Sequence, residues 1–264
     1  MKNTFTAWAT ALALTFAVAG CSEKDSVPAP DQGVSTSALN QIRALGFSTQ
    51  NVQRDEDGNY LVEGDIVLTP ENLSQRAEIQ LLRVGQDEQY RTTNLVTGLP
   101  RTITVSLSTQ FPASYAQALD LALARYNDEN LQLRFTRVSG DADIRFFLGA
   151  GNFLASAGFP SGGDPFNRIR VNVRAIGDAP QATIATILAH EIGHCIGFRH
   201  TDYYDRSISC GGSTSNEGSG GIGAILIPGT PSSADLSSWM LACVANGQNR
   251  PFSSNDRTAL NYLY

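Results

Sequence analysis

The chain has 264 residues, of which 42% are hydrophobic and 17% are charged. This composition provides enough apolar material for one sizeable core, and one or two domains are expected at this length. The formal net charge of −6 argues against a nucleic-acid-binding surface, so we expect no nucleic-acid partner. Histidine is scarce, with three residues in the chain, and this scarcity makes their spacing informative.

The beginning of the chain has the pattern of an export signal. Lys2 precedes an apolar run from Ala7 to Ala19, which is too short to span a bilayer and is typical of a removed signal peptide. The run leads into Val-Ala-Gly-Cys, which resembles the bacterial lipobox, so we expect residues 1–20 to be removed and Cys21 to be lipidated. An ordinary cleavage site before a cysteine is the alternative. This interpretation predicts an exported bacterial lipoprotein at the outer membrane or cell surface, with the lipid as its membrane contact.

Residues 21–37 contain several Pro, Ser and Asp residues without periodicity, so we expect a flexible tether. A small block follows over residues 38–98. Its apolar pattern and turn residues predict one short helix and extended runs joined by turns. The expected elements are a helix from Ala38 to Gly46, a turn at 55–59, and extended runs at 60–62 and 66–68. A calcium loop is an alternative for the acidic turn, but a hairpin turn explains it better.

From residue 99 onward the pattern becomes a regular succession of strands and helices, which predicts an α/β (α+β) fold. The expected elements are strands at 103–107, 131–138, 144–148 and 169–173, a helix from Pro112 to Tyr126, and a short strand at 154–157. This short strand stands beside Gly/Pro-rich loops, as expected at a sheet edge. One long helix follows, with Asp178 as its expected N-cap and Pro180 in its first turn.

The long helix contains the sequence HEIGHCIGFRH, from His190 to His200. Because His190 and His194 are four residues apart, both imidazoles leave one helix face and can hold one Zn²⁺. Gly197 can end the helix in a left-handed conformation, which allows His200 to return as a third ligand. Glu191 follows the first ligand and is directed at the open position of the metal.

Buried structural histidines are the alternative explanation of this motif. All three histidines of the chain fall within these eleven residues, together with a glutamate at the acid/base position and a glycine at the turn. The complete pattern therefore favours a single zinc site, and no histidine remains for a second one. The turn at Gly162-Gly163-Asp164 is a weak candidate for structural calcium, and a plain turn explains it better.

The motif His-Glu-x-x-His-x-x-Gly-x-x-His resembles the metzincin signature, and its HEIGH wording resembles the dual-action HEIGH metallopeptidases. The resemblance covers residues 99–264 and implies a twisted mixed sheet, a long active-site helix, a Met-turn at Met240 and a closing helix at 256–264. It implies that an extended protein or peptide substrate pairs with the edge strand at 154–157. It also implies hydrolysis by a zinc-activated water with Glu191 as the general base.

A second resemblance concerns the block at 38–98. Its Gly64-Asp65 pair resembles the Gly-Asp motif of astacin propeptides, in which the aspartate occupies the open zinc position. We therefore predict a propeptide at 38–98 with Asp65 as the zymogen switch, a plain hairpin turn being the alternative. Cleavage near residues 96–101 would then also release the catalytic domain, 99–264, from its lipid anchor.

Three cysteines remain if Cys21 is lipidated. An exported protein favours one disulfide and one odd thiol. We prefer the pair Cys210 and Cys243, although the sequence alone does not choose among the three pairings. Cys195 is expected to be buried, because it points away from the helix face of the zinc ligands.

Two alternative functions remain at this point. One is a zinc hydrolase that acts on an ester or a side-chain amide, since the motif constrains the metal and the base more than the scissile group. The other is a non-catalytic surface lipoprotein that binds peptide or glycan, and Glu191 argues against it because a binder does not need that carboxylate. We expect the protein to be a monomer.

Overall fold

In this computed structural model the chain is described for residues 33–74, 89–218, 223–231 and 234–264. The expected signal peptide, Cys21 and most of the expected tether lie outside these residues. All described residues belong to the compact unit Asp31–Tyr264. Within the described part of the chain, no helix combines the length and the apolar character that a membrane span needs.

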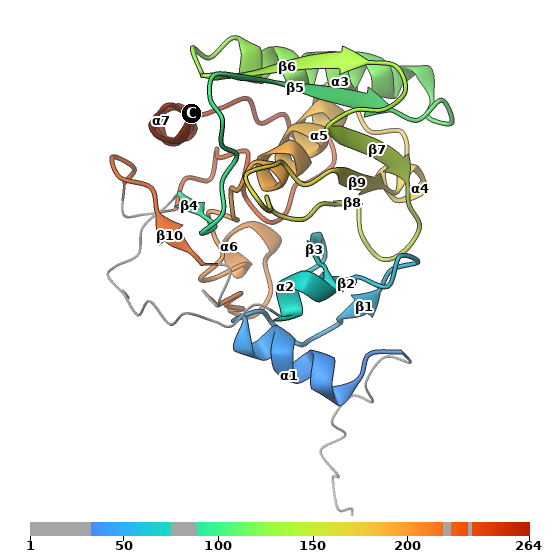
Figure 1. The fold of residues 1–264 in the computed structure, drawn as a ribbon, viewed down its shortest axis with the longest axis vertical. Helices are drawn as coiled ribbons and strands as arrows, with labels where there is room; N and C mark the ends of the chain where they lie inside the picture. Colours follow the sequence, from blue (N-terminus) through green and yellow to red (C-terminus); the bar gives the residue numbers. More distant parts are fainter. Residues whose placement is uncertain (1–32, 75–88, 219–222, 232–233) are drawn as a thin grey trace, which may run out of the picture. The chain divides into compact units, whose positions relative to one another are not determined.

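The described residues from 89 to 264 form what we call the main layer. It contains a five-stranded mixed sheet that runs from β6 at the top of Figure 1 down to β8. The strand order is β6-β5-β7-β9-β8, and neighbours pair in parallel except β8, which is antiparallel to β9 at one edge. The strands are β5 (Arg101–Leu107), β6 (Leu133–Val138), β7 (Ile144–Leu148), β8 (Ala155–Ser156) and β9 (Arg168–Val171). The predicted mixed α/β fold, with a short edge strand, is confirmed.

Two long helices, α3 (Ala113–Asn127) and α5 (Gln181–Cys195), pack against each other and share one apolar core with the strands. In α3 the buried residues recur at helical spacing, as expected for a helix with one face on the core. In α5 every residue from Thr183 to Cys195 is buried. A helix that is buried all round provides a rigid support for the side chains that it carries.

The expected N-cap of α5 is wrong. The helix begins at Gln181, three residues after Asp178, with Pro180 at the N-cap position and no side-chain cap bond. The backbone N–H groups of Thr183 and Ile184 donate to the Pro180 carbonyl oxygen, at 2.9 and 3.1 Å. Pro180 therefore lies one position before the first turn in which we expected it, and the Asp178 side chain does not cap the helix.

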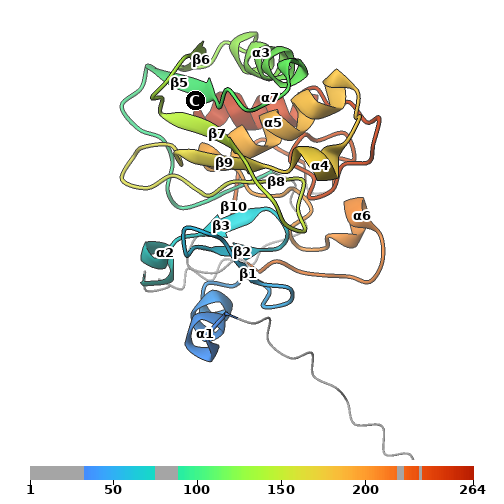
Figure 2. The same cartoon turned by 90° about the vertical axis from the view of Figure 1, so that its right-hand side faces the viewer.

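The N-terminal layer, residues 36–74, is built on a three-stranded antiparallel sheet with its own small core (Figure 2). It contains α1 (Thr36–Ala44), β1 (Gln53–Arg54), β2 (Tyr60–Val62), β3 (Ile66–Leu68) and α2 (Pro70–Ser74). Asp55 closes the turn between β1 and β2, since its Oδ1 accepts from the backbone N–H groups of Asp57 and Asn59. Phe159 of the main layer completes the core of this layer and so joins the two layers.

The C-terminal half of the main layer is mostly irregular. Its short elements are α6 (Ser207–Cys210) and β10 (Ile225–Leu226), and β10 pairs with β4 (Tyr90–Arg91). Another short helix, α4 (Val173–Ile176), precedes α5. The last helix, α7 (Ser254–Leu263), begins with a capping box between Ser253 and Asp256. The structure places Cys210 and Cys243 in a disulfide and leaves Cys195 free and buried.

Candidate metal centre

The end of α5 brings the three histidines together. His190 and His194 lie one helical turn apart, with ring centroids separated by 4.7 Å. His200 returns to the same place, so that its Nε2 lies 3.2 Å from Nε2 of His194 and 3.3 Å from Nε2 of His190. Three ring nitrogens therefore converge on one point, although they lie on two segments of the chain.

Gly197 makes this return possible. It follows the C-cap residue Ile196 with a φ of +110°, a conformation that favours glycine. A Cβ at this position would lie 2.7 Å from Leu95 Cδ2 and 3.0 Å from the Asn94 carbonyl oxygen. Glycine is therefore needed here both for the backbone conformation and for the space beside residues 94 and 95.

Each histidine is oriented through its second ring nitrogen. Nδ1 of His190 lies 2.9 Å from the Trp239 carbonyl oxygen, and Nδ1 of His194 lies 2.8 Å from the Phe198 carbonyl oxygen. Both contacts assign the proton to Nδ1, which leaves the Nε2 lone pairs directed at the shared point. Metal-binding histidines are typically held in this way by an outer acceptor.

Asp65 supplies a carboxylate to the same point. It belongs to the turn between β2 and β3 of the N-terminal layer, and its Oδ2 lies 3.1 Å from Nε2 of His200 and 3.8 Å from Nε2 of His190. The three histidine nitrogens and this oxygen all lie within 4.8 Å of one another. Three nitrogens and one carboxylate oxygen match the ligands that zinc prefers.

The remaining oxygens of the site also fit a cation. Asp65 Oδ1 and Glu191 Oε2 are buried and have no hydrogen-bond partner among the described residues. A buried carboxylate oxygen without a donor is costly unless a positive charge lies nearby. The residues present therefore fit a bound zinc ion, with His190, His194 and His200 as ligands and Asp65 at a fourth position.

The charges around His200 favour a cation at this place. Burial alone would lower the pKa of His200, but the carboxylates of Asp65 and Glu217 outweigh burial and raise this pKa well above its ordinary value. Burial and the neighbouring histidines lower the pKa of His190 to about 4, and that of His194 well below its ordinary value. The site therefore keeps two neutral imidazoles, as metal ligation requires, and stabilises one positive charge.

Glu191 supplies a further buried carboxyl to the site. It is 2% exposed and lines the same cavity as His190. Burial, and then the negative charge of Asp65, raise the pKa of Glu191 well above its ordinary value. This environment favours uptake of a proton, which suits an acid/base residue.

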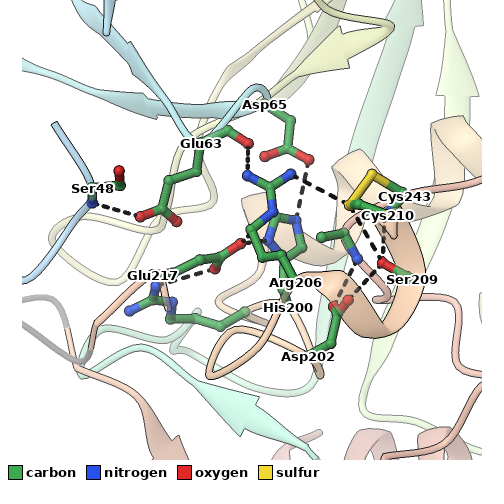
Figure 3. A network of polar contacts seen from close by, with 12 residues as sticks. Ser48, Glu63, Asp65, His200, Asp202, Arg206, Ser209, Cys210, Glu217 and Cys243 are labelled. Carbon is green, nitrogen blue, oxygen red and sulfur yellow. Dashed lines mark hydrogen bonds and ion pairs between the residues drawn. A yellow bond between two sulfur atoms is a disulfide. The ribbon is translucent and has the colours of Figure 1, made fainter. Parts of the chain in front are cut away.

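Glu217 is a functional residue that the sequence analysis missed (Figure 3). Its Oε1 lies 2.6 Å from Nδ1 of His200 and 3.3 Å from Nε of Arg206, and its Oε2 lies 3.5 Å from Nη2 of Arg199. Burial alone would raise its pKa, but these three cationic groups outweigh burial and lower the pKa to about 2. A lone glutamate in a Gly/Ser-rich segment gives no sequence signal for such a role.

The segment around Met240 lies beneath the histidines. The Trp239 carbonyl accepts from His190, and Met240 is fully buried. A Cβ on Gly193 would lie 2.5 Å from Met240 Sδ, so the glycine between the first two histidines leaves space for this methionine. Met240 therefore packs against α5 beside Gly193, between the first two histidines.

The N-terminal layer also occupies the edge of the main sheet. Ile66 forms an isolated parallel bridge with Ala157, directly after β8. The backbone N–H of Val67 donates to the Ala157 carbonyl at 2.8 Å, and the N–H of Ala157 donates to the Asp65 carbonyl at 2.9 Å. The residues that place Asp65 at the histidines therefore pair with the edge at which we expected an extended peptide.

The turn at residues 162–164, the weak candidate for calcium, forms contacts within the protein. Asp164 Oδ1 accepts from Nη2 of Arg101 at 2.8 Å, and residues 161 and 164 pair across the turn. Among the described residues, one cluster of metal-binding side chains could hold an ion, and it consists of Asp65 and the three histidines. The turn interpretation explains this segment without a calcium ion.

The family model of the dual-action HEIGH metallo-peptidases matches residues 60–264. This chain belongs to that family. The HEIGH metallopeptidases take their name from a motif that stands here at residues 190–194, at the converging histidines described above. The predicted family is confirmed, and with it a metal-dependent peptidase that acts on protein or peptide substrates.

Two solved structures of myroilysin also resemble this HEIGH metallopeptidase. The first is 19% identical with a TM-score of 0.42 and covers 65% of this chain and 96% of that chain. The second is 16% identical with a TM-score of 0.38 and covers 62% of this chain and 83% of that chain. A comparison with curated protein sequences found no match.

Proposed function

We propose that this HEIGH metallopeptidase is a zinc-dependent endopeptidase made in a latent form. The observation that supports this most strongly is the convergence of three histidine Nε2 atoms beside the buried carboxyl of Glu191. His190, His194 and His200 would hold the ion. Zinc, when bound, supplies a Lewis acid that polarises a carbonyl oxygen and lowers the pKa of a water to about 7.

Glu191 acts as the general base. Its Oε2 has no hydrogen-bond partner among the described residues, so it is available to accept a proton from the attacking water. Its pKa is raised by burial and by the charge of Asp65, which brings the carboxyl closer to the working range of an acid/base catalyst. The same carboxyl then gives the proton to the leaving amine.

The edge of the sheet serves as the docking site for the substrate backbone. An extended peptide that pairs with β8 adds a strand to the sheet, and the backbone hydrogen bonds hold it across the site. In the form described here Asp65 and Val67 take up these hydrogen bonds through Ala157. A substrate must therefore displace this segment before it can bind.

Latency follows from these contacts. The Asp65 carboxylate lies at the fourth position of the site, 3.1 Å from His200, where a substrate carbonyl or a water would otherwise approach. Arg206 holds the same turn, because its guanidinium donates to the Glu63 carbonyl oxygen (Figure 3). We infer that Asp65 is the zymogen switch and that the propeptide must leave or be cut for full activity.

The test compares three forms of the chain from residue 22 onward: wild type, Asp65→Ala and Asp65→Ala/Glu191→Gln. We expect about one zinc ion per chain in each form, because the three histidines are intact. Casein cleavage should be fastest in Asp65→Ala and at least about a hundredfold slower in the double variant.

Three outcomes would contradict the proposal in different ways. Purification of all forms without zinc contradicts the metal site, and equal casein cleavage by Asp65→Ala and the double variant contradicts the role of Glu191. Cleavage of ester or side-chain amide substrates by Asp65→Ala, with casein intact, would favour the alternative hydrolase.

We also propose that Cys21 carries the lipid that anchors the exported protein at the outer membrane or cell surface. The lipobox-like sequence before Cys21 supports this. Metabolic labelling with a fatty-acid analogue should mark the full-length protein but not Cys21→Ser. Equal labelling of both proteins would contradict the anchor.

A further inference from the structure

A cavity of about 200 Å³ opens directly beside the candidate metal centre. It is lined on one side by His190 and Glu191. Much of its wall is apolar and comes from Leu154, Ile187, Leu241 and Val244. Because a cavity of about 150 Å³ can hold a benzene-sized molecule, this one has space for a substrate side chain.

Two arginines, Arg206 and Arg250, interrupt the apolar wall. Arg206 already has an anionic partner, since its Nε lies 3.3 Å from Glu217. Arg250 is different: it is 9% exposed, and none of the described carboxylates lies within ion-pair distance of it. Asp202 and Asp256 influence its charge over longer distances.

The other arginines that are buried in the described part of the chain are paired. Arg170 lies 2.5 Å from Asp57, and Arg199 lies 3.5 Å from Glu217. A buried cation without a carboxylate is unusual, because desolvation of the charge is then poorly compensated. Arg250 therefore differs from Arg170 and Arg199, and it lines the cavity beside the reacting groups.

The hydrogen bonds of Arg250 leave donors available. Nη1 donates to the Cys243 carbonyl at 2.7 Å, and Nη2 donates to Oε1 of Gln248 at 2.9 Å. A guanidinium has five N–H donors, so these two bonds fix its position and leave others for a ligand. A planar guanidinium held in this way is suited to a carboxylate, which can accept two bonds at once.

We propose that Arg250 is a specificity-determining residue, and that the cavity takes the acidic side chain of a glutamate or aspartate next to the scissile bond. This inference rests on the proposed peptidase function and specifies its substrate class. The apolar wall contacts the methylene groups of that side chain, while the guanidinium of Arg250 neutralises its carboxylate. Arg206 adds positive charge at the same cavity.

The test measures cleavage specificity in the Asp65→Ala background, with Glu191 intact. Cleavage sites in a library of proteome-derived peptides are mapped by mass spectrometry, and matched Glu and Gln peptides then give kcat/KM ratios. We expect acidic residues to be enriched at one position flanking the cut. The Glu peptide should exceed its Gln counterpart by about tenfold or more, which a hydrogen bond between charged groups can supply.

Three further variants in the same background separate charge from structure. Arg250→Gln should abolish the preference for Glu, and Arg250→Lys should retain part of it because the charge remains. Arg125→Gln is the matched control, because Arg125 supports the same loop through Asn249 and the Arg250 carbonyl but does not line the cavity. It should leave the Glu-to-Gln ratio unchanged even if it lowers stability.

The outcomes distinguish this inference from the function on which it rests. Cleavage by Asp65→Ala without an acidic preference, or an unchanged ratio in Arg250→Gln, overturns the specificity role and leaves the peptidase function intact. A loss of the ratio in Arg125→Gln equal to that in Arg250→Gln also overturns it, because loop stability would then explain the effect. If Asp65→Ala cleaves no peptide, the proposed function fails and the inference fails with it.

Discussion

Among the three histidines, His200 alone is held by a carboxylate, that of Glu217, and the other two are held by backbone carbonyls. A carboxylate acceptor increases the basicity of the imidazole and so strengthens its bond to a metal. We predict that Glu217→Gln weakens zinc binding by about 10- to 100-fold. Competition with a chelator measures this affinity.

Glu129→Gln is the control for this experiment, because Glu129 forms an ion pair with Arg257 away from the histidines. Its zinc affinity should equal that of wild type. An unchanged affinity in Glu217→Gln would contradict the assigned role of Glu217.

At the residue scale, the sequence indicated the side chains that share one short motif. His190 and His194 are separated by one helical turn, and the glycine at 197 explains how His200 can return, so local geometry was sufficient. Glu217 and Arg250 could not be found in this way. They reach the site from loops whose paths depend on the packing of the whole main layer, and neither stands in a recognisable pattern.

Helix α5, which carries the site, contains Gly193 in its interior. Alanine is ordinarily the better helix former at such a position. A Cβ on Gly193 would lie 2.5 Å from Met240 Sδ and 3.1 Å from Trp239 Nε1. We predict that Gly193→Ala lowers the free energy of unfolding by about 1 to 3 kcal/mol through overpacking. Urea unfolding monitored by circular dichroism measures the change.

A double variant tests the cause of this loss. Met240→Ala removes the side chain that the new methyl group would meet, so the costs of Gly193→Ala and Met240→Ala should not add. If the two losses in free energy of unfolding add, contact with Met240 is not the reason why residue 193 must be glycine.

The start of α7 holds the Met240 segment through Asp256. This buried carboxylate accepts from the Trp239 and Ser253 backbone N–H groups and from the side chains of Gln89 and Ser238. Asp256→Ala would leave buried donors unsatisfied, and we predict a loss of about 3 kcal/mol or more in the free energy of unfolding.

Asp120→Ala is the comparison for that measurement. Asp120 forms an exposed ion pair with Arg137 on the surface of α3, and its removal should cost less than about 1 kcal/mol. Similar losses in the two variants would contradict the supporting role of Asp256.

At the element scale, hydrophobic periodicity predicted most strands and helices of the main layer, because their apolar faces share one core. The error at Asp178 has a local cause. Asp and Pro both favour a helix start, so the sequence around Asp178 and Pro180 does not identify which of the two residues is the N-cap. The start of α7 was expected at Asp256, two residues too late, because Asp256 is the third residue of the helix in a capping box that Ser253 begins.

At the scale of the whole molecule, charged contacts help to hold the N-terminal layer on the main layer. Asp57 lies 2.5 Å from both Arg168 and Arg170, and Glu56 also pairs with Arg170. Since Asp57 is partly exposed, each of these ion pairs is sensitive to salt.

We therefore predict that Asp57→Asn weakens latency. The loss of about 1 kcal/mol of docking free energy should raise the basal peptidase activity about fivefold, and high salt should reduce the difference from wild type. Peptide cleavage at low and high NaCl measures both effects. Asp120→Asn serves as the control, and an Asp57→Asn chain as latent as wild type would contradict this account of docking.

The contact between the layers was the least predictable part of the fold. The sequence identified Gly64-Asp65 only through a resemblance, and a hairpin turn remained an alternative explanation of the residues themselves. The parallel pairing of Ile66 with Ala157 joins segments about ninety residues apart, and no local pattern encodes it. Such a contact depends on surface complementarity that forms only after both layers have folded.

The central claim is that three histidines hold a metal whose fourth position is taken by Asp65. The most direct measurement is the visible absorption spectrum of the Co²⁺-loaded chain from residue 22 onward, in wild type and Asp65→Ala, before and after addition of a hydroxamate. We predict that the two spectra differ, and that the hydroxamate changes the spectrum of Asp65→Ala but not that of wild type. Identical spectra that respond equally to the hydroxamate would contradict the claim.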